Sequence, residues 1–109
     1  MVTIIRVVVL LFLALQLVFA QVSSSTITGT VPDASGAVIH NAKVTITQQA
    51  RAVSRTVVTN DRGEFSAPNL PIGQYTVTIT VPGFKTQVFN DIVLVVDKVL
   101  NLPVTLQPG

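Results

Sequence analysis

The stretch that decides the fold is QYTVTITV at residues 74–81, in which apolar and polar side chains alternate. In an extended chain Tyr75, Val77 and Ile79 point to one side, and the threonines between them point to the other. This period of two is typical of a strand that packs on one face and meets water on the other. We therefore predict that residues 74–81 form a central strand of a β-sheet.

Similar patterns on both sides of this stretch predict further strands, and no segment after residue 25 carries a helix signal. The segments that we expect to be extended are residues 26–31, 42–48, 53–59, 64–67, 84–89 and 92–96, and a last strand with Leu100, Leu102, Val104 and Leu106 on one face.

Turn-forming residues separate these segments at roughly ten-residue spacing, as in small β-sandwiches. Residues 60–63, Asn-Asp-Arg-Gly, predict a hairpin turn, and Asn90-Asp91 predicts another turn. Pro103 lacks a backbone N–H, which places the last strand at or near a sheet edge. The fold class that we predict is all-β, a small antiparallel Greek-key β-sandwich of about seven strands.

Residues 1–20 have the features of a secretory signal peptide. The single charge Arg6 precedes an apolar run of 14 residues, Val7 to Ala20, which is shorter than the roughly 20 residues that a transmembrane helix needs. The small residue Ala20 suits cleavage before Gln21. The alternative is an uncleaved anchor, against which Gln16 and the polar segment after residue 20 argue.

Removal of residues 1–20 leaves a polar linker at residues 21–25 and one domain at residues 26–107. The 109-residue chain has no cysteine, which excludes a disulfide framework, a thiolate metal site and a thiol nucleophile. Beyond residue 20 there are six Lys or Arg and five Asp or Glu, a net charge of +1, so we expect no nucleic-acid partner. We expect Arg51, Arg55 and Arg62, near the second hairpin, to be solvated.

Six motifs occur in an order that resembles a known family. They are ITGTV (27–31), DASGA (33–37), AKVTI (42–46), TNDRGEF (59–65), NLPIGQY (69–75) and PGF (82–84). Together they resemble the carboxypeptidase regulatory-like domain, a transthyretin-like β-sandwich related to the B-type repeats of adhesins. The resemblance implies an accessory module of the kind found beside peptidases, adhesins, glycan-active enzymes and outer-membrane receptors.

We predict no catalytic, metal-binding or cofactor-binding residue. His40 is the only histidine and is expected in an exposed loop. Asp33, Asp61, Asp91 and Asp97 lack the dense spacing of a calcium loop and suit turns instead. Among the aromatic residues, Phe65 and Tyr75 are expected in the core, whereas Phe84 and Phe89 are the residues that could contact a ligand, although capping the end of the sandwich accounts for them better.

The predicted function is that of an exported, non-catalytic structural or binding module. Its expected setting is the N-terminal accessory domain of an outer-membrane protein that resembles TonB-dependent receptors, or a fragment of one, since the chain stops directly after the last strand. The alternatives are a free-standing domain, a carbohydrate-binding module of a secreted protein and, third, an enzyme.

The expected partners are a neighbouring domain or another protein, bound at the edge of the last strand, with a glycan as the second choice. The membrane is involved only through export or a receptor. The expected location is the periplasm, the outer membrane or the extracellular space.

The exported product should begin at Gln21, because Ala20 and Val18 form a small-residue cleavage site and the apolar run is too short for a stable anchor. Mass spectrometry of the N-terminus of the exported protein tests this. Membrane-bound protein that retains residues 1–20 would contradict the prediction.

Overall fold

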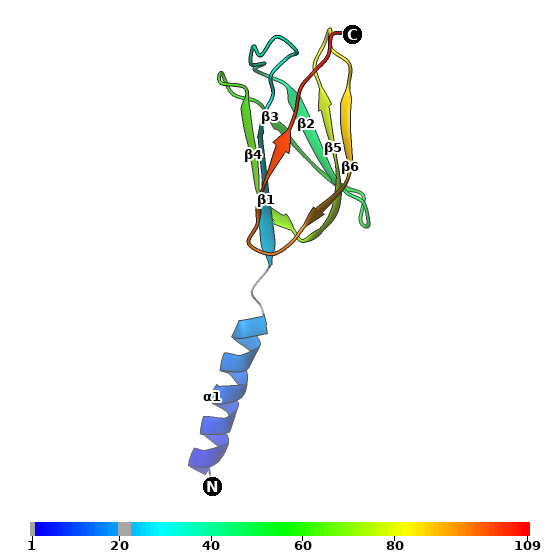
Figure 1. The fold of residues 1–109 in the computed structure, drawn as a ribbon. Coiled ribbons are helices and arrows are strands. Elements are labelled where there is room, and N and C mark those ends of the chain that lie inside the picture. Colours follow the sequence, from blue (N-terminus) through cyan, green and yellow to red (C-terminus); the bar gives the residue numbers. More distant parts are fainter. Residues whose placement is uncertain (1, 20–22) are drawn as a thin grey trace.

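The structure is a computed structural model that describes residues 2–19 and 23–109. Its elements are α1 Val2–Phe19, β1 Ser24–Thr30, β2 Lys43–Gln48, β3 Val53–Val58, β4 Glu64–Pro71, β5 Gly73–Thr80, β6 Gln87–Leu94 and β7 Val99–Pro103. The strands form a sandwich of two sheets (Figure 1). The predicted all-β sandwich of about seven strands is therefore confirmed.

Helix α1 coincides with most of the segment that the sequence predicts to be a signal peptide. The predicted cleavage site between Ala20 and Gln21 lies outside the described residues, so cleavage stays a prediction. Within the described part of the chain, no helix combines the length and the apolar character needed to cross a membrane.

Neither sheet follows the order of the chain. One sheet has the strand order β4-β1-β7 and the other has the order β3-β2-β5-β6. Among the described strands, the hairpins β2–β3 and β5–β6 connect neighbours within a sheet, and the other connections cross from one sheet to the other. Strands that are adjacent in space, such as β2 and β5, are thus distant in sequence, as in a Greek-key sandwich.

The prediction of an antiparallel sandwich holds for four of the five strand pairings in the described chain, and β1 and β7 pair in parallel. The connection between β6 and β7 explains this exception. It lies beside the start of β1, where Asp97 N donates to Ser24 O (3.0 Å) and Thr26 N donates to Lys98 O (2.9 Å). The chain therefore enters β7 at the end of the sheet where β1 begins, and both strands run the same way.

The predicted hairpin at residues 60–63 is wrong, because the two strands that this turn connects do not pair with each other. The turn itself is present, because Gly63 N donates to Asn60 O and Asn60 N donates to Glu64 O, both at 2.9 Å. However, β4 pairs with β1 instead of β3, and Glu64 lies opposite Thr30. Strand β4 crosses to the other sheet, where its inward residues Phe65, Ala67 and Leu70 are buried.

The predicted turn at Asn90-Asp91 is a bulge within β6. The pairs Val77–Phe89 and Tyr75–Ile92 show that β6 has one more residue than β5 over this interval. Asp91 adopts a φ of +57°, and its carboxylate accepts a hydrogen bond from Gln74 Nε2 (2.8 Å). Asn and Asp tolerate positive φ in a bulge as readily as in a turn, so the local signal does not separate the two.

Strand β1 begins at Ser24, two residues before the predicted start. Ser24 and Ser25 pair with Pro71 and Leu70 of β4. Ser25 is buried, and its hydroxyl donates a hydrogen bond to Lys98 O at 2.6 Å. Because this bond replaces the water that a serine hydroxyl otherwise contacts, a polar residue can extend the strand.

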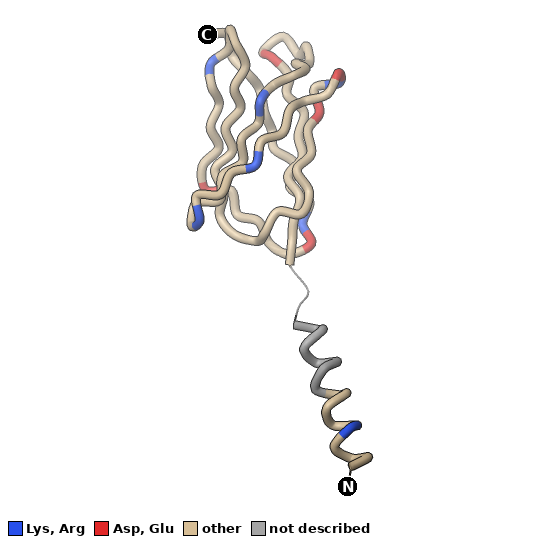
Figure 2. Tube along the Cα trace, turned by 180° about the vertical axis from the view of Figure 1, so that it is seen from behind, with Lys and Arg blue, Asp and Glu red and all other residues tan. Residues whose placement is uncertain are grey.

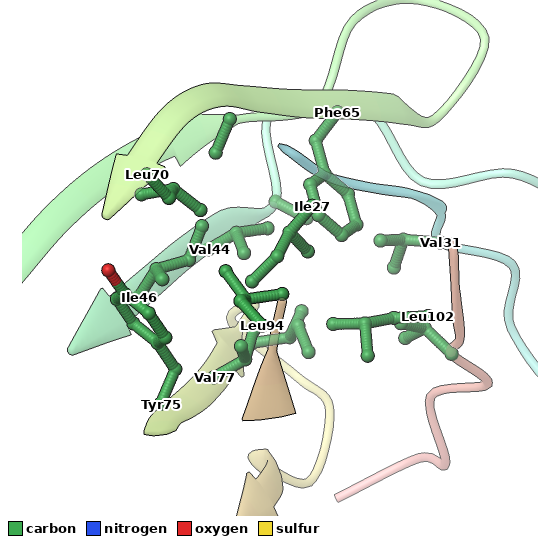
Figure 3. Packing of buried hydrophobic residues seen from close by; sticks show 14 of the residues in the cluster. Ile27, Val31, Val44, Ile46, Phe65, Leu70, Tyr75, Val77, Leu94 and Leu102 are labelled. Atoms are coloured by element: carbon green, nitrogen blue, oxygen red, sulfur yellow. The ribbon is translucent and has the colours of Figure 1, made fainter. Parts of the chain in front are cut away.

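The core lies between the sheets and contains inward-facing side chains from both. Figure 3 shows Leu94 and Val77 of one sheet facing Ile27 of the other, with Tyr75 beside Ile46. Tyr75 is 2% exposed, and Val77 and Ile79 are fully buried, so the predicted inward face of β5 and its central position are confirmed. Burying each such side chain contributes roughly 1.5–3 kcal/mol.

The Phe65 ring occupies the space that a side chain at Gly29 would take. The two residues lie opposite each other in β1 and β4. A Cβ atom at Gly29 would lie 2.6 Å from Phe65 Cε1, closer than packed carbon atoms approach. The absence of a side chain at Gly29 therefore lets the aromatic ring lie directly over the β1 backbone.

Replacing Gly29 by Ala should destabilise the domain by about 1–3 kcal/mol, because the Phe65 ring must shift within a packed core. Urea unfolding of the exported protein measures this cost. The same substitution in a Phe65→Leu background should cost less than half as much. Equal costs in the two backgrounds would show that the ring is not the obstacle.

Candidate functional site

Phe84 and Phe89, the predicted ligand contacts, are half-buried and pack against the core. Phe89 lies in β6 opposite Val77, on the inward face of its sheet. Phe84 lies in the turn after β5, and its N–H donates to Val81 O at 3.1 Å. Neither residue lines the three clefts described below. Both therefore have packing roles, and ligand contact by either one stays a prediction.

The C-terminal segment covers the end of the sandwich at which Phe84 lies. Lys85 N donates to Gln107 O (2.8 Å), and Leu106 N donates to Pro32 O (2.9 Å). The segment thus links the β5–β6 connection of one sheet to the chain that leaves β1 in the other sheet. Figure 1 shows the C-terminus at the end opposite to the start of β1. The backbone of the protein itself occupies much of the surface beside Phe84.

The polar residues that could have formed a reactive centre lie apart. Asp33 accepts hydrogen bonds from the hydroxyl and the N–H of Ser35 (2.6 and 2.9 Å), and the hydroxyl bond is the main reason why the pKa of Asp33 is lowered. His40 is exposed in the connection before β2. Among the described residues, no three His, Asp or Glu side chains come together to hold a metal ion.

A polar cleft of about 480 Å³ lies on the outer face of the three-stranded sheet. Thr28 of β1 lies opposite both Ser66 of β4 and Asn101 of β7, so hydroxyl and amide groups form a row across the three strands. The full lining is Thr28, Gly29, Thr30, Val58, Asn60, Glu64, Phe65, Ser66 and Asn101.

A second cleft, of about 310 Å³, follows the edge strand β7 and is lined by Thr30, Pro32, Asn101, Leu102, Pro103 and Val104. Strand β7 has β1 on one side and no further strand of the described chain on the other. Pro103 is the last residue of β7, so its predicted position at a sheet edge is confirmed. The backbone groups on the outer side of β7 can therefore accept or donate hydrogen bonds to another chain.

The third cleft, the arginine cleft, has a volume of about 330 Å³ and lies between the edge strands β3 and β4. Ile46, Leu70 and Tyr75 form its buried floor. The rest of its lining is Gln48, Arg51, Val53, Ser54, Arg55 and Pro71. Charged residues are sparse in the sandwich and most lie in connecting loops, so two arginines in one cleft stand out (Figure 2).

Arg55 joins the two sheets at this cleft. It lies opposite the buried Ile46, so it points toward the interior from the edge strand β3. Its guanidinium donates to the backbone oxygens of Pro68 and Asn69 in β4, the latter at 3.4 Å. The β4 ladder is irregular at these two residues, and Asn69 has a φ of +58°. The guanidinium thus pairs carbonyl groups on the outer edge of β4 where the strand bulges.

This cleft was not predicted from the sequence. Arg51, Arg55 and Arg62 are exposed, as expected for solvated charges, but the expectation did not include a cleft shared by two of them. The structure separates Arg62, in the turn before β4, from Arg51 and Arg55. A signal was present, because Val53, Arg55 and Val57 share one face by the period of two. An arginine between two valines on the inward face indicates an open sheet edge, where a long side chain can reach the other sheet.

Tyr75 connects the arginine cleft to the core. Its hydroxyl donates a hydrogen bond to Pro71 O at 2.6 Å, as expected for a buried phenol with a partner at the rim. Burial raises the pKa of Tyr75 above its ordinary value of 10.0, and the positive charges of Arg55 and Arg51 partly oppose this. Tyr75, Arg51 and Arg55 all line the same cleft.

Comparison with known proteins identifies the fold more closely. The family model of the carboxypeptidase regulatory-like domain matches residues 26–107. No curated protein sequence matches the chain significantly.

Many solved structures have similar folds, and three of them illustrate the range. The TIE protein of Bacillus anthracis has a TM-score of 0.61 and 17% identity, over 79% of this chain and 17% of that one. Catechol 1,2-dioxygenase of Acinetobacter radioresistens has a TM-score of 0.61 and 16% identity, over 82% and 53%. A putative carbohydrate-binding protein of Bacteroides uniformis has a TM-score of 0.63 and 14% identity, over 77% and 41%. The chain thus spans about half or less of each of these proteins, and at these identities the likeness concerns the fold alone.

The raised pKa of Tyr75 predicts how stability depends on pH. The native state keeps the phenol proton at a pH where the unfolded state loses it, so the contribution of Tyr75 is complete below about pH 10 and is lost as the pH rises through the native pKa. The free energy of unfolding should therefore fall above about pH 10 more steeply in the wild type than in Tyr75→Phe.

At pH 7 the free energy of unfolding of Tyr75→Phe should be about 1 kcal/mol lower than that of the wild type, because the variant lacks the hydrogen bond to Pro71 O. Urea unfolding from pH 7 upward compares the two proteins. Tyr75 is the only tyrosine in the chain, so other groups titrate equally in both. Parallel pH profiles would contradict the prediction.

Proposed function

The chain belongs to the carboxypeptidase regulatory-like domain family, and we propose that it is an exported, non-catalytic module that binds a neighbouring domain or a partner protein. The observation that carries this proposal is the open edge of β7 with its adjoining cleft of about 310 Å³. An extended segment can add to such an edge through main-chain hydrogen bonds and place side chains in the cleft.

The setting that we propose is the N-terminal accessory domain of an outer-membrane protein similar to TonB-dependent receptors. One observation supports an accessory role, and one prediction supports the compartment. The fold occurs within longer proteins, of which this chain spans between 17% and 53% in the three cases above. The predicted signal peptide also directs the chain to the periplasm, the outer membrane or the exterior.

A non-catalytic role is supported by what the reactive side chains do. Asp33 stabilises a turn and Asp91 stabilises the bulge in β6. His40 lies in an exposed connection before β2, and among the described residues no three His, Asp or Glu side chains come together. General acid–base catalysis needs such groups to converge on one reacting atom. Asp33 and Asp91 instead support the local structure of a turn and a bulge.

A carbohydrate-binding module is the second candidate, and the polar cleft favours it. Its row of Thr28, Ser66 and Asn101 offers hydroxyl and amide groups that can bond to sugar hydroxyls. Phe84 and Phe89, the aromatic candidates for stacking on a sugar ring, lie outside this cleft. A glycan-array signal that Asn101→Ala, Phe84→Ala or Phe89→Ala abolishes would favour this candidate over protein binding.

Partner binding at β7 can be tested with a photo-crosslinking amino acid at Asn101, on this edge strand, and at Thr80, an exposed residue of β5 in the other sheet. We expect the Asn101 variant to form a defined crosslink in the source organism, either to one envelope protein or to a further domain of the same polypeptide. The Thr80 variant should form none. Equal crosslinking from both positions, or none from Asn101, would contradict the proposed docking edge.

A further inference from the structure

The arginine cleft lies on the opposite side of the sandwich from β7. In the three-stranded sheet β4 and β7 flank β1 on opposite sides, and the cleft lies between β4 and β3. A ligand in this cleft would therefore be separate from a partner at β7. The proposal that follows does not depend on the proposed function.

The cleft combines an apolar floor with positive charge. Ile46, Leu70 and Tyr75 are at most 3% exposed and form a floor that an apolar side chain can contact. Val53 on the rim is 61% exposed, an unusual position for an apolar residue on the inward face of a sandwich. The lining includes two arginines and no acidic residue. The chemistry of the cleft thus favours a ligand with both an apolar part and an anionic group.

One of the two charges is held in place before any ligand arrives. The contacts of Arg55 with the Pro68 and Asn69 oxygens fix its guanidinium at the mouth of the cleft. Because these contacts do not use all five N–H donors of a guanidinium, Arg55 can also bond to a carboxylate. Arg51, in the β2–β3 turn, adds a second positive charge at the same rim. A preorganised charge loses less side-chain entropy on binding than a mobile one.

The strand that borders the cleft indicates the form of the ligand. Val53, Ser54 and Arg55 are consecutive residues of β3, an edge strand that has no further strand of the described chain on its outer side. An extended peptide can bond to this side through its backbone while alternate side chains enter the cleft. We infer that the arginine cleft binds an extended acidic peptide, with a carboxylate at Arg51 and Arg55 and an apolar side chain over Ile46 and Leu70.

The peptide acetyl-Thr-Val-Thr-Glu-Thr-Val-amide tests this inference, since its valines and its glutamate share one face of a strand. Titration of the isotope-labelled exported protein, followed by NMR, should give saturable shifts at the backbone amides of Val53, Arg55 and Leu70. Raising the ionic strength from about 20 to about 200 mM should weaken binding. The analogue with Gln in place of Glu should bind at least about fivefold more weakly.

Two variants of equal charge change provide the matched comparison. Arg51→Gln should weaken binding of the peptide about fivefold or more, because it removes one cationic partner and leaves the Arg55 contacts in place. Arg62→Gln, outside the cleft, should bind like the wild type. Equal weakening by both variants would show that only net charge matters and would overturn the inference.

The remaining outcomes also decide the question. Equal binding of the Glu and Gln peptides would overturn the role of the carboxylate. Shifts of the same size and place with the dicarboxylate glutarate would show a site for small anions and overturn the peptide proposal. Crosslinking at Asn101 reports on the other edge, so failure here is distinguishable from failure of the proposed function.

Discussion

The burial of β5 between β2 and β6 and beneath the three-stranded sheet is the interaction on which the rest of the structure depends. Tyr75, Val77 and Ile79 present one continuous apolar face, and antiparallel pairing with β2 fixes Val44 and Ile46 on the same side. Because side chains alternate, this single choice of face determines which residues of β3 and β6 point inward as well. The inward positions of Arg55 and Phe89 follow from it.

The sequence predicts most strongly where local pattern and global fold agree. The alternation in residues 74–81 and the proline at position 103 identify a central strand and an edge strand, and both are confirmed. Local signals failed where one backbone conformation serves two purposes. Positive φ at Asp91 suits a turn or a bulge, and the turn at residues 60–63 suits a hairpin or a crossover. Only the pairing of each strand in the complete sandwich decides between these alternatives.

The three clefts were not predicted, for a related reason. The arginine cleft exists because β3 and β4, which lie in different sheets, end up at the same side of the sandwich. The polar cleft requires β1, β4 and β7 to pair in the observed register. A sequence pattern can predict the inward face of a strand, as it does for residues 74–81, but not the neighbour of that strand across the sandwich. An inward charge such as Arg55 also discourages uncontrolled pairing of an exposed edge, so one residue can protect an edge and offer a binding group.

The parallel pairing of β1 and β7 has a mechanical consequence. The chain enters β1 at one end of the sandwich and leaves β7 at the other, and the ladder between them runs from Thr26–Val99 to Thr30–Pro103. A force that pulls the preceding and following segments apart therefore acts along this ladder and loads its hydrogen bonds in shear, all at once. Peeling would break the same bonds one after another at lower force. The topology thus makes the sandwich a tension-bearing link between whatever is attached at its two ends.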